Sequence, residues 1–334
     1  MNSEKKKIIA IINPISGTRP KTHIPTLIKE QINPNKFEVE ILYTEYAGHA
    51  TQIAHKAEEE GIDYVLAIGG DGTINETAKA LIHTPTVLGI IPLGSGNGLA
   101  RHLGISLDAA KAIAVVNEEK VISIDYCKAN EHIFFCTAGL GFDALISKKF
   151  AEDKHRGSLT YIKNVLTEYL KYQPQSYRIV CEEGELQEKA FLIACANASQ
   201  YGNNAFIAPG ANMQDGLMDI TILRPFNHLE GPQLALQLFT KQITRNSKIL
   251  SLRSKSFKII LEKEQIMHVD GEPISMGNEI SMQTIHAGLK ILVPSSPSHS
   301  LIEPFQHAIE EIHYSLVSDI KEVFSKMQSS SEAY

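Results

Sequence analysis

The stretch Gly69-Gly70-Asp71-Gly72-Thr73-Ile74-Asn75-Glu76 lies between a short apolar segment, Tyr64–Ile68, and a segment with helical spacing, Ile74–Leu81. Three glycines within four positions let the backbone turn tightly and approach a ligand closely. The following helix points unpaired N–H groups and the positive end of its dipole at the same space. Thr73 adds a hydroxyl, and Asp71 adds a carboxylate suited to hold a metal ion or to orient a phosphate acceptor. The stretch therefore predicts a phosphate-binding turn from a strand to a helix.

Two more loops of this kind follow neighbouring predicted strands. Lys7–Ile12 ends in Asn13-Pro14-Ile15-Ser16-Gly17, and Thr86–Ile91 leads into Gly94-Ser95-Gly96-Asn97-Gly98. Strands that alternate with helices predict a parallel, doubly wound sheet, which binds ligands at the carboxyl ends of its strands. We therefore expect the three loops to meet in a nucleotide site. Arg101, one helical turn beyond Asn97, is expected to face the same phosphates or to be a solvated surface residue.

The pattern changes near residue 125, where short strands separated by turn residues begin. They predict an antiparallel β-sandwich, so we expect an α/β domain at residues 1–127 and a sandwich domain at residues 128–300. Helical spacing is seen at Leu229–Lys241. The predicted strands are Val121–Lys128, His132–Ala138, Tyr177–Cys181, Lys189–Ala196, Met218–Leu223, Phe257–Leu261, Ile266–Val269 and Ile280–Ile285.

A strongly amphipathic helix is predicted for the tail, residues 303–328, whose apolar residues fall on one stripe. Packing of this helix against the α/β domain is the simplest interpretation. A homodimer interface and a membrane-facing surface are the alternatives.

Composition excludes several classes of protein. The formal net charge of −6 argues against a strongly basic nucleic-acid binder, so no nucleic-acid partner is expected. No stretch is apolar for long enough to predict a transmembrane span. The four cysteines are scattered without metal-type spacing, which favours buried thiols in a reducing cytoplasm. Neither a GxSxG elbow nor an HExxH motif is present.

Taken in order, Asn-Pro-x-Ser-Gly, Gly-Gly-Asp-Gly-Thr-x-Asn-Glu and Pro-Leu-Gly-Ser-Gly-Asn-Gly-Leu-Ala-Arg resemble the diacylglycerol kinase catalytic family. The resemblance covers roughly residues 7–295. It implies an ATP-dependent lipid kinase that requires Mg²⁺ and binds ATP between an α/β domain and a β-sandwich. It also implies a role in phospholipid biosynthesis, a lipid substrate at the membrane surface, and peripheral access from the cytoplasm.

The resemblance also implies site residues. Thr44, near the end of a predicted strand, joins the three loops around ATP, Gly141 and Asp143 line the lipid side, and Asp270-Gly271-Glu272 supplies the proton acceptor. The loop around Asp215 resembles a structural metal loop, in which Asp215 would bind Mg²⁺ through its side chain and Asn212 and Leu217 through backbone carbonyls. The residues expected at ATP are Asn13, Pro14, Ser16, Gly17, Thr44, Gly69, Gly70, Asp71, Gly72, Thr73, Asn75, Glu76, Gly94, Ser95, Asn97 and Arg101, and those expected to be catalytic are Asp71, Asp270 and Glu272.

Several alternatives stay open. Gly98 stands where bacterial diacylglycerol kinases usually carry Asp, and the wording of this loop also resembles sphingosine kinases, so the acceptor is either diacylglycerol or a sphingoid base. NAD kinases share a Gly-Gly-Asp-Gly loop. A non-catalytic nucleotide or lipid sensor on the same fold is the alternative from another class. From the residues alone, Asp270-Gly271 and Asp215-Gly216 are also typical of simple turns.

Overall fold

The computed structural model describes residues 4–17, 21–152, 168–182 and 184–296. The predicted tail helix at residues 303–328 lies outside this described part. None of the helices in the described ranges is both long and apolar enough to cross a lipid bilayer.

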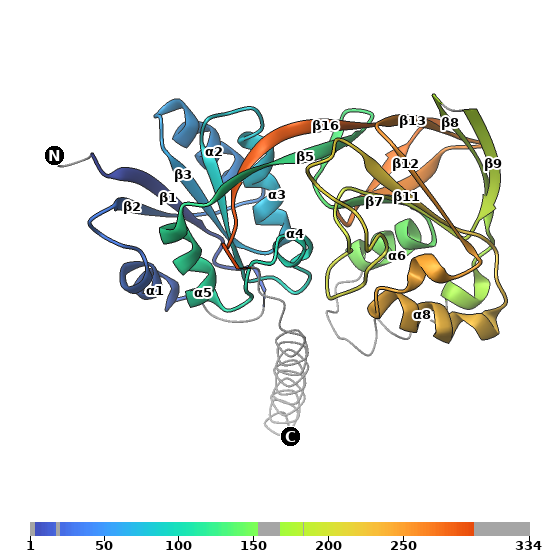
Figure 1. Cartoon of the computed structure of the whole chain (residues 1–334), viewed down its shortest axis with the longest axis horizontal. Helices are drawn as coiled ribbons and strands as arrows, with labels where there is room; N and C mark the ends of the chain where they lie inside the picture. The colour runs from blue at the N-terminus through green and yellow to red at the C-terminus, as the bar shows by residue number, and fades with distance from the viewer. Residues whose placement is uncertain (1–3, 18–20, 153–167, 183, 297–334) are drawn as a thin grey trace, which may run out of the picture.

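The N-terminal lobe is an α/β layer built on four parallel strands in the order β2-β1-β3-β4 (Figure 1). β3 and β4 are buried along their whole length, as expected for parallel strands covered on both faces. Helix α1 packs with α5, and α2 packs with α3. This confirms the predicted α/β fold. Its elements are β1 (Lys6–Ile12), α1 (Ile24–Gln31), β2 (Phe37–Tyr43), α2 (His49–Glu59), β3 (Tyr64–Gly69), α3 (Asp71–Ala80), β4 (Val87–Pro92), α4 (Gly98–His102) and α5 (Ala109–Ala114).

The C-terminal lobe confirms the predicted antiparallel sandwich. Six strands form one sheet in the order β12-β11-β10-β7-β14-β15, and its inner face packs on the far end of the larger sheet through a buried apolar core. Its elements are β5 (Val121–Ala129), β6 (His132–Phe134), β7 (Thr137–Gly141), α6 (Phe142–Glu152), β8 (Gln175–Cys181), β9 (Gly184–Ala190), β10 (Leu192–Ala196), β11 (Met218–Leu223), η2 (His228–Glu230), α8 (Gly231–Phe239), β12 (Ile249–Ser254), β13 (Ser256–Leu261), β14 (Gln265–Val269), β15 (Glu272–Met276) and β16 (Glu279–Leu292).

Two predictions about these strands were wrong. The segment His132–Ala138 is divided between β6, which pairs with β5, and β7, which pairs with β10 and β14 in the other sheet. The segment Lys189–Ala196 is not a single strand, because the chain changes sheets at Phe191. Ala190 ends β9, which pairs with β8, whereas Leu192 opens β10, which pairs with β7 and β11. Ala190, Phe191 and Leu192 are all apolar, so the residues at the crossing itself do not mark it.

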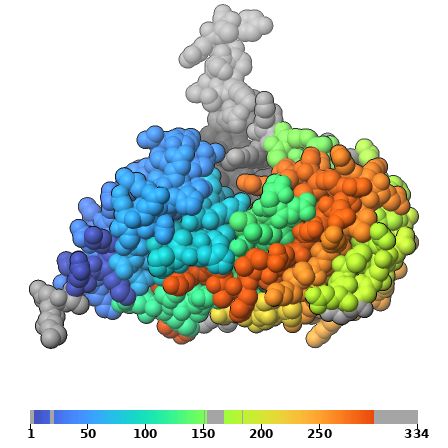
Figure 2. Space-filling model, turned by 90° about the horizontal axis from the view of Figure 1, so that it is seen from above, coloured from blue at the N-terminus to red at the C-terminus, as the bar shows by residue number. Residues whose placement is uncertain are grey.

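The two lobes share strands. β16 has 14 residues, pairs with β13 at one end, and reaches β4 in parallel through Ile291 at the other. β5 runs beside it across the junction, and Figure 2 shows orange residues extending from the C-terminal lobe into the blue and cyan one. The predicted division between residues 127 and 128 falls inside β5. That boundary stays a prediction, and the ten-stranded sheet passes through it.

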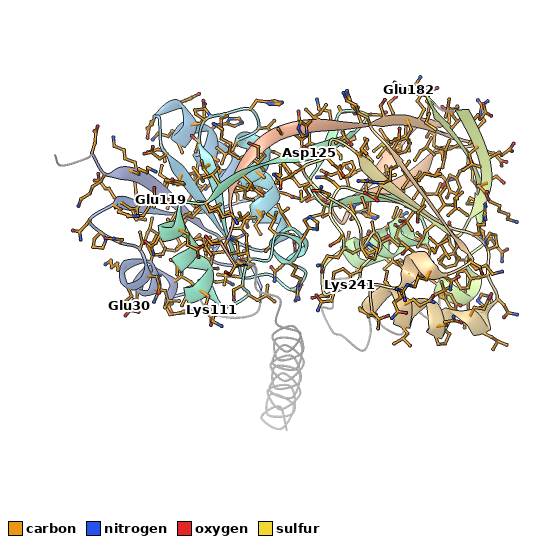
Figure 3. The ribbon with its side chains drawn as sticks, in the orientation of Figure 1. Glu30, Lys111, Glu119, Asp125, Glu182 and Lys241 are labelled. Atoms are coloured by element: carbon orange, nitrogen blue, oxygen red, sulfur yellow. The ribbon has the colours of Figure 1, made fainter. Side chains whose placement is uncertain are left out.

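A fully buried carboxylate fixes the bend in β16. The pairing of β16 with β5 shifts register between Ile285 and Leu289, and Ala287 has a positive φ of 52° there. Asp125 of β5 accepts the Ala287 N–H at 2.7 Å and lies 2.8 Å from His286 Nδ1. Asp125 sits at the junction between the lobes (Figure 3).

A second polar contact joins the lobes at the end of α4. The N–H of Ser199 donates to His102 Nδ1 at 3.0 Å, and the Ser199 hydroxyl lies 3.0 Å from the same atom. Burial lowers the pKa of His102 from 6.5 to about 4. The imidazole is therefore neutral near pH 7, and Nδ1 is the acceptor of the backbone N–H.

This contact predicts a pH-dependent stability. Because the folded state disfavours the charged imidazole, the unfolded chain binds more protons between pH 6.5 and about 4. The contribution of the buried neutral His102 to the free energy of unfolding is complete above pH 6.5. It is lost as the pH falls toward 4, by roughly 3 kcal/mol in all. We expect the unfolding free energies of wild type and His102→Gln, measured in urea, to converge as the pH falls through this window. A difference that stays constant from pH 7.5 to 4.5 would contradict the assignment.

Candidate functional site between the lobes

The three predicted loops meet at one edge of the parallel sheet. β1, β3 and β4 end side by side, because Ile12 pairs with Ile68 and Gly69 pairs with Pro92. Asn13 Nδ2 donates to Thr73 Oγ1 at 2.9 Å, which ties the first loop to the second. The alternation of strands and helices in the sequence therefore predicted this convergence, because loops that follow parallel strands lie at one edge of the sheet.

The glycines allow the loops to touch through their backbones. Gly17 has a φ of +61°, and a Cβ there would lie 2.0 Å from the Leu93 carbonyl oxygen. A Cβ on Gly94 would lie 2.7 Å from the Cα of Gly70. Real Cβ atoms do not approach this closely, so side chains at these two positions would push the loops apart.

Asp71 holds the third loop in place. Its Oδ2 accepts the Asn97 N–H and its Oδ1 accepts the Gly98 N–H, both at 2.9 Å. Asn97 is fully buried in a left-handed conformation, and its side chain accepts from the Gly94 N–H and donates to the Gly94 carbonyl. A carboxylate offers about four lone-pair positions, and these two amides use two of them.

The first turn of α3 presents free backbone donors. The N–H groups of Asp71, Gly72 and Thr73 have no hydrogen-bond partner within the described residues. A Cβ on Gly72 would meet no atom within 4 Å, so the space in front of this turn is open. Unpaired N–H groups at a helix start favour a bound anion.

Other residues expected at ATP have structural partners. Glu76 Oε1 accepts the Gly48 N–H at 2.9 Å and thereby ties α3 to the residue before α2. Arg101 folds back, with Nε donating to the Gly96 carbonyl at 3.0 Å and Nη1 to Asn204 Oδ1 at 3.4 Å. Thr44 is buried where β2 ends, and its N–H donates to the Ile12 carbonyl. Pro14 and Ser95 are exposed on their loops, while the Ser16 hydroxyl donates to the Asn13 carbonyl.

Asp270 joins the two lobes. Asp270-Gly271 is the two-residue turn between β14 and β15, and both residues have positive φ, 48° and 87°. The Asp270 carboxylate accepts three consecutive N–H groups at 2.8–2.9 Å, those of Phe135, Cys136 and Thr137. It also accepts from Asn75 Nδ2 of α3 at 3.1 Å. Burial raises the pKa of Asp270, and the three amides act in the opposite direction.

Glu272 differs sharply from Asp270. It is the first residue of β15 and is exposed. Within the described part of the chain its carboxylate has no hydrogen bond or ion pair. The contact between Asn75 and Asp270 brings the turn that precedes Glu272 against α3. One carboxylate of this motif is thus committed to the fold, and the other is available.

Asp143 lies in a buried polar cluster of the C-terminal lobe. Its Oδ2 accepts from the Tyr201 hydroxyl at 3.0 Å and lies 3.2 Å from His268 Nε2. A Cβ on Gly139 would lie 2.2 Å from this carboxylate, so only glycine fits there. Gly141 has a φ of +96° and packs against the Phe191 carbonyl. His268 was missed, although a polar residue within the apolar stretch Ile266–Val269 is a usable signal.

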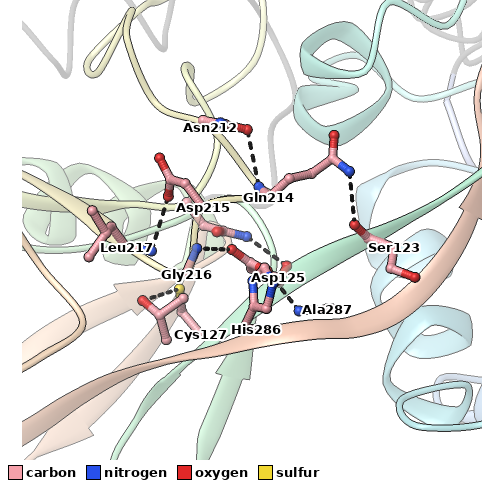
Figure 4. A network of polar contacts seen from close by, with 12 residues as sticks. Ser123, Asp125, Cys127, Asn212, Gln214, Asp215, Gly216, Leu217, His286 and Ala287 are labelled. Atoms are coloured by element: carbon pink, nitrogen blue, oxygen red, sulfur yellow. Dashed lines mark hydrogen bonds and ion pairs between the residues drawn. The ribbon is translucent and has the colours of Figure 1, made fainter.

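The predicted metal loop lies against β5 (Figure 4). Asp215 Oδ1 accepts the Leu217 N–H at 3.0 Å, and Oδ2 forms an ion pair with Arg253. Asn212 Oδ1 accepts the Gln214 N–H at 3.1 Å. The Gly216 N–H donates to the buried Asp125 at 2.7 Å, which anchors the loop. No group of three or more His, Cys, Asp and Glu side chains suited to a metal occurs in the described ranges.

The glycine loops and the polar cluster around Asp143 are in contact. The Tyr201 carbonyl would lie 3.3 Å from a Cβ on Gly98, whose N–H binds Asp71. The Asn203 N–H donates to the Gly96 carbonyl at 3.2 Å. A loop of the C-terminal lobe thus covers the third glycine loop and also supplies the Tyr201 hydroxyl to Asp143.

Comparisons with known proteins agree with this architecture. Residues 7–129 match the diacylglycerol kinase catalytic domain, and residues 136–292 match the YegS C-terminal NAD kinase beta sandwich-like domain. A protein of Escherichia fergusonii named "Probable lipid kinase YegS" is 31% identical over 264 residues, which cover 77% of this chain and 87% of the relative. A "Probable lipid kinase YegS-like" protein of Chromohalobacter salexigens is 34% identical over 232 residues, which cover 68% of this chain and 75% of the relative.

The fold has a counterpart among solved structures. A diacylglycerol kinase crystal structure from Bacillus anthracis superposes with a TM-score of 0.69 at 21% identity, covering 88% of this chain and 99% of that chain. The two matched domains span most of the sequence. The chain therefore belongs to the diacylglycerol kinase catalytic family, and it is a lipid kinase, a phosphotransferase with an alcohol acceptor.

Proposed function

We propose that this lipid kinase transfers the γ-phosphate of ATP to a hydroxyl of diacylglycerol, with Mg²⁺ as cofactor, at the cytoplasmic membrane surface. The observation that carries the proposal is the contact between Asn75 and Asp270. It holds α3, whose first turn carries the open N–H groups, against the turn that precedes Glu272. Phosphoryl transfer mainly requires positioned phosphates, neutralised charge and an oriented hydroxyl.

ATP would lie along the three loops. The free N–H groups of Asp71, Gly72 and Thr73 would bind its phosphates, and the Asn13–Gly17 and Gly94–Asn97 loops would enclose them. Arg101 already donates to the Gly96 carbonyl and Asn204, so we assign it to shaping the third loop. The same reasoning makes Glu76 a residue that orients α2 beside the site.

Mg²⁺ fits beside Asp71, because two of the lone-pair positions on this carboxylate are unused by its two amide partners. When bound, the ion would neutralise charge on the phosphates. A second, structural Mg²⁺ is proposed at Asp215 with the carbonyl oxygens of Asn212 and Leu217. These two carbonyls have no hydrogen-bond partner within the described residues. The ion would share Asp215 with Arg253.

Glu272 is our choice for the proton acceptor. Asp270 already accepts four hydrogen bonds, and removing them would release the turn between the lobes. Glu272 is exposed and unpaired in the described structure, so it can take a proton without disturbing the fold. Asp143, with Gly141 beside it, would bind the lipid headgroup through the carboxylate that Tyr201 and His268 orient.

A substrate panel tests the proposed reaction. The full chain, incubated with ATP and Mg²⁺, is expected to release ADP and form a lipid phosphate with diacylglycerol, to lose this activity with a chelator, and to leave NAD unchanged. Sphingosine is the essential second lipid, because Gly98 stands where bacterial diacylglycerol kinases usually carry Asp and its loop also resembles that of sphingosine kinases. A Cβ on Gly98 would lie 3.3 Å from the Tyr201 carbonyl, so an Asp at this position would be crowded. Preference for sphingosine would reassign the acceptor, and no phosphorylation of any acceptor would favour a sensor.

Glu272→Gln is expected to lower turnover by about 10²–10⁴-fold, because general-base help of this size is typical and Gln cannot take a proton. The ATP concentration at half-saturation should change little. Glu264→Gln, an exposed carboxylate of the same lobe, is the matched control. Asp270→Asn should instead lower the thermal unfolding midpoint. A folded but inactive Asp270→Asn together with a fully active Glu272→Gln would reverse the two roles.

A further inference from the structure

Four large apolar side chains are exposed on one face of the C-terminal lobe. Leu229 is 87% exposed, Leu236 64%, Leu170 63% and Phe239 55%. Leu170 is close to η2 in the chain fold, because its neighbour Tyr169 donates its hydroxyl to the His228 carbonyl at 3.1 Å. Single exposed apolar residues are ordinary, whereas a contiguous group marks an interaction surface.

Helix α8 carries no charged residue and is apolar on two faces. Leu234 is buried against the lobe. Pro232, Ala235, Leu236 and Phe239 are exposed, at the spacing i, i+3, i+4 and i+7 that forms a stripe along a helix. A surface helix normally turns polar residues outward, so the outer stripe of α8 requires a partner or a nonaqueous surface.

The stripe is held in a fixed position. Asn227 and Glu230 form a capping box around η2, in which Asn227 Oδ1 accepts the Leu229 N–H at 3.0 Å and Glu230 Oε2 accepts the Asn227 N–H at 2.7 Å. This box orders the turn that carries Leu229 directly before α8. The exposed apolar face, defined here as Leu170, Leu229, Pro232, Ala235, Leu236 and Phe239, therefore belongs to ordered structure.

Cations flank this face. Residues 225–248 contain Lys241, Arg245 and Lys248 but only one carboxylate, Glu230, in a chain whose net charge is −6. Lys241 and Arg245 are exposed, and Lys241 lies beside α8 (Figure 3). None of the three cations forms an ion pair within the described residues. This local charge is opposite in sign to that of the whole chain.

The face lies close to the proposed lipid side of the site. The ring of Phe142, the neighbour of Asp143, is 6.2 Å from the ring of Tyr169, and Tyr169 is 5.0 Å from His228 of η2. Helices α6 and α8 lie on the same side of the C-terminal lobe in Figure 1. A series of aromatic contacts thus connects the turn before α8 with the neighbour of the residue assigned to the headgroup.

We propose that this exposed apolar face docks on an anionic phospholipid bilayer, with Leu229, Leu236 and Phe239 entering the interface and Lys241 and Arg245 contacting acidic headgroups. Apolar side chains beside basic ones are the composition that binds such an interface. The inference rests on the proposed function in one respect: a lipid acceptor must be drawn from a bilayer. A second copy of the chain is less well matched, because it would bring the same cations together.

The test is co-sedimentation of the full chain with vesicles of phosphatidylcholine alone or mixed with phosphatidylglycerol. Wild type is expected to bind the mixed vesicles and to be released by salt. The double variant Leu236→Gln/Phe239→Gln should lose roughly tenfold or more in affinity, and Lys241→Gln/Arg245→Gln should lose the preference for phosphatidylglycerol. The matched control is Val121→Gln/Lys29→Gln, which changes an exposed apolar and an exposed basic residue elsewhere. Thermal unfolding midpoints show that each variant is folded.

Activity separates this inference from the proposed function. The α8 variant Leu236→Gln/Phe239→Gln should phosphorylate a monomeric short-chain diacylglycerol as wild type does. It should lose activity toward diacylglycerol in vesicles. The docking proposal would be overturned if the wild-type protein did not bind anionic vesicles, or if the α8 variants bound them as well as wild type. Conversion of a wild-type dimer into a monomer by Leu236→Gln/Phe239→Gln would assign the face to self-association and would also overturn it. Vesicle binding without phosphorylation of any lipid would refute the function and leave the surface intact.

Discussion

The Asp270 carboxylate is the interaction on which the relation between the lobes depends. It collects three consecutive N–H groups from the segment before β7 and one amide from α3. An unpaired carboxylate in such a place would be costly, because burial disfavours its charged form. Three of the four donors lie in the same lobe as Asp270, and the fourth, Asn75 Nδ2, contributes only while α3 and the β14–β15 turn remain in contact. The geometry of the phosphate loops and that of the opposing hairpin are therefore set together.

Asp71 likewise accepts backbone N–H groups with its carboxylate, inside the N-terminal lobe. It binds two amides of the third loop and so makes the position of that loop depend on the second. Because buried N–H groups need acceptors, a carboxylate in a glycine-rich loop can organise backbone before it meets any ligand. Asp71, Asp270 and Asp125 all act in this way, whereas Glu272 does not. A short acidic motif thus contains one carboxylate that is bonded to the fold and one that is exposed and unpaired within the described residues.

Local pattern predicted much of this fold, and the failures have physical causes. β3 and β4 were predictable because both faces of a parallel strand are buried and read as unbroken apolar runs. The convergence of the glycine loops followed from the alternation of strands and helices. The crossing at Phe191 and the reach of β16 into the first sheet were not predictable, because pairing partners far apart in sequence leave no local signal. For the same reason, residue spacing in the sequence revealed neither the hydrogen bonds from Asp71 to the third loop nor the His268–Asp143 contact.

Helix α8 shows a different limit of prediction from sequence. Helical spacing at Leu229–Lys241 predicted a helix, which the structure confirms as η2 and α8. A helix that is apolar on two faces gives no indication of which face turns inward, since the usual contrast between polar and apolar sides is missing. Only the structure shows that Leu234 is buried while Leu236 and Phe239 face outward. The missing contrast between polar and apolar sides, which weakens the prediction from sequence, is also the observation from which the bilayer-docking proposal starts.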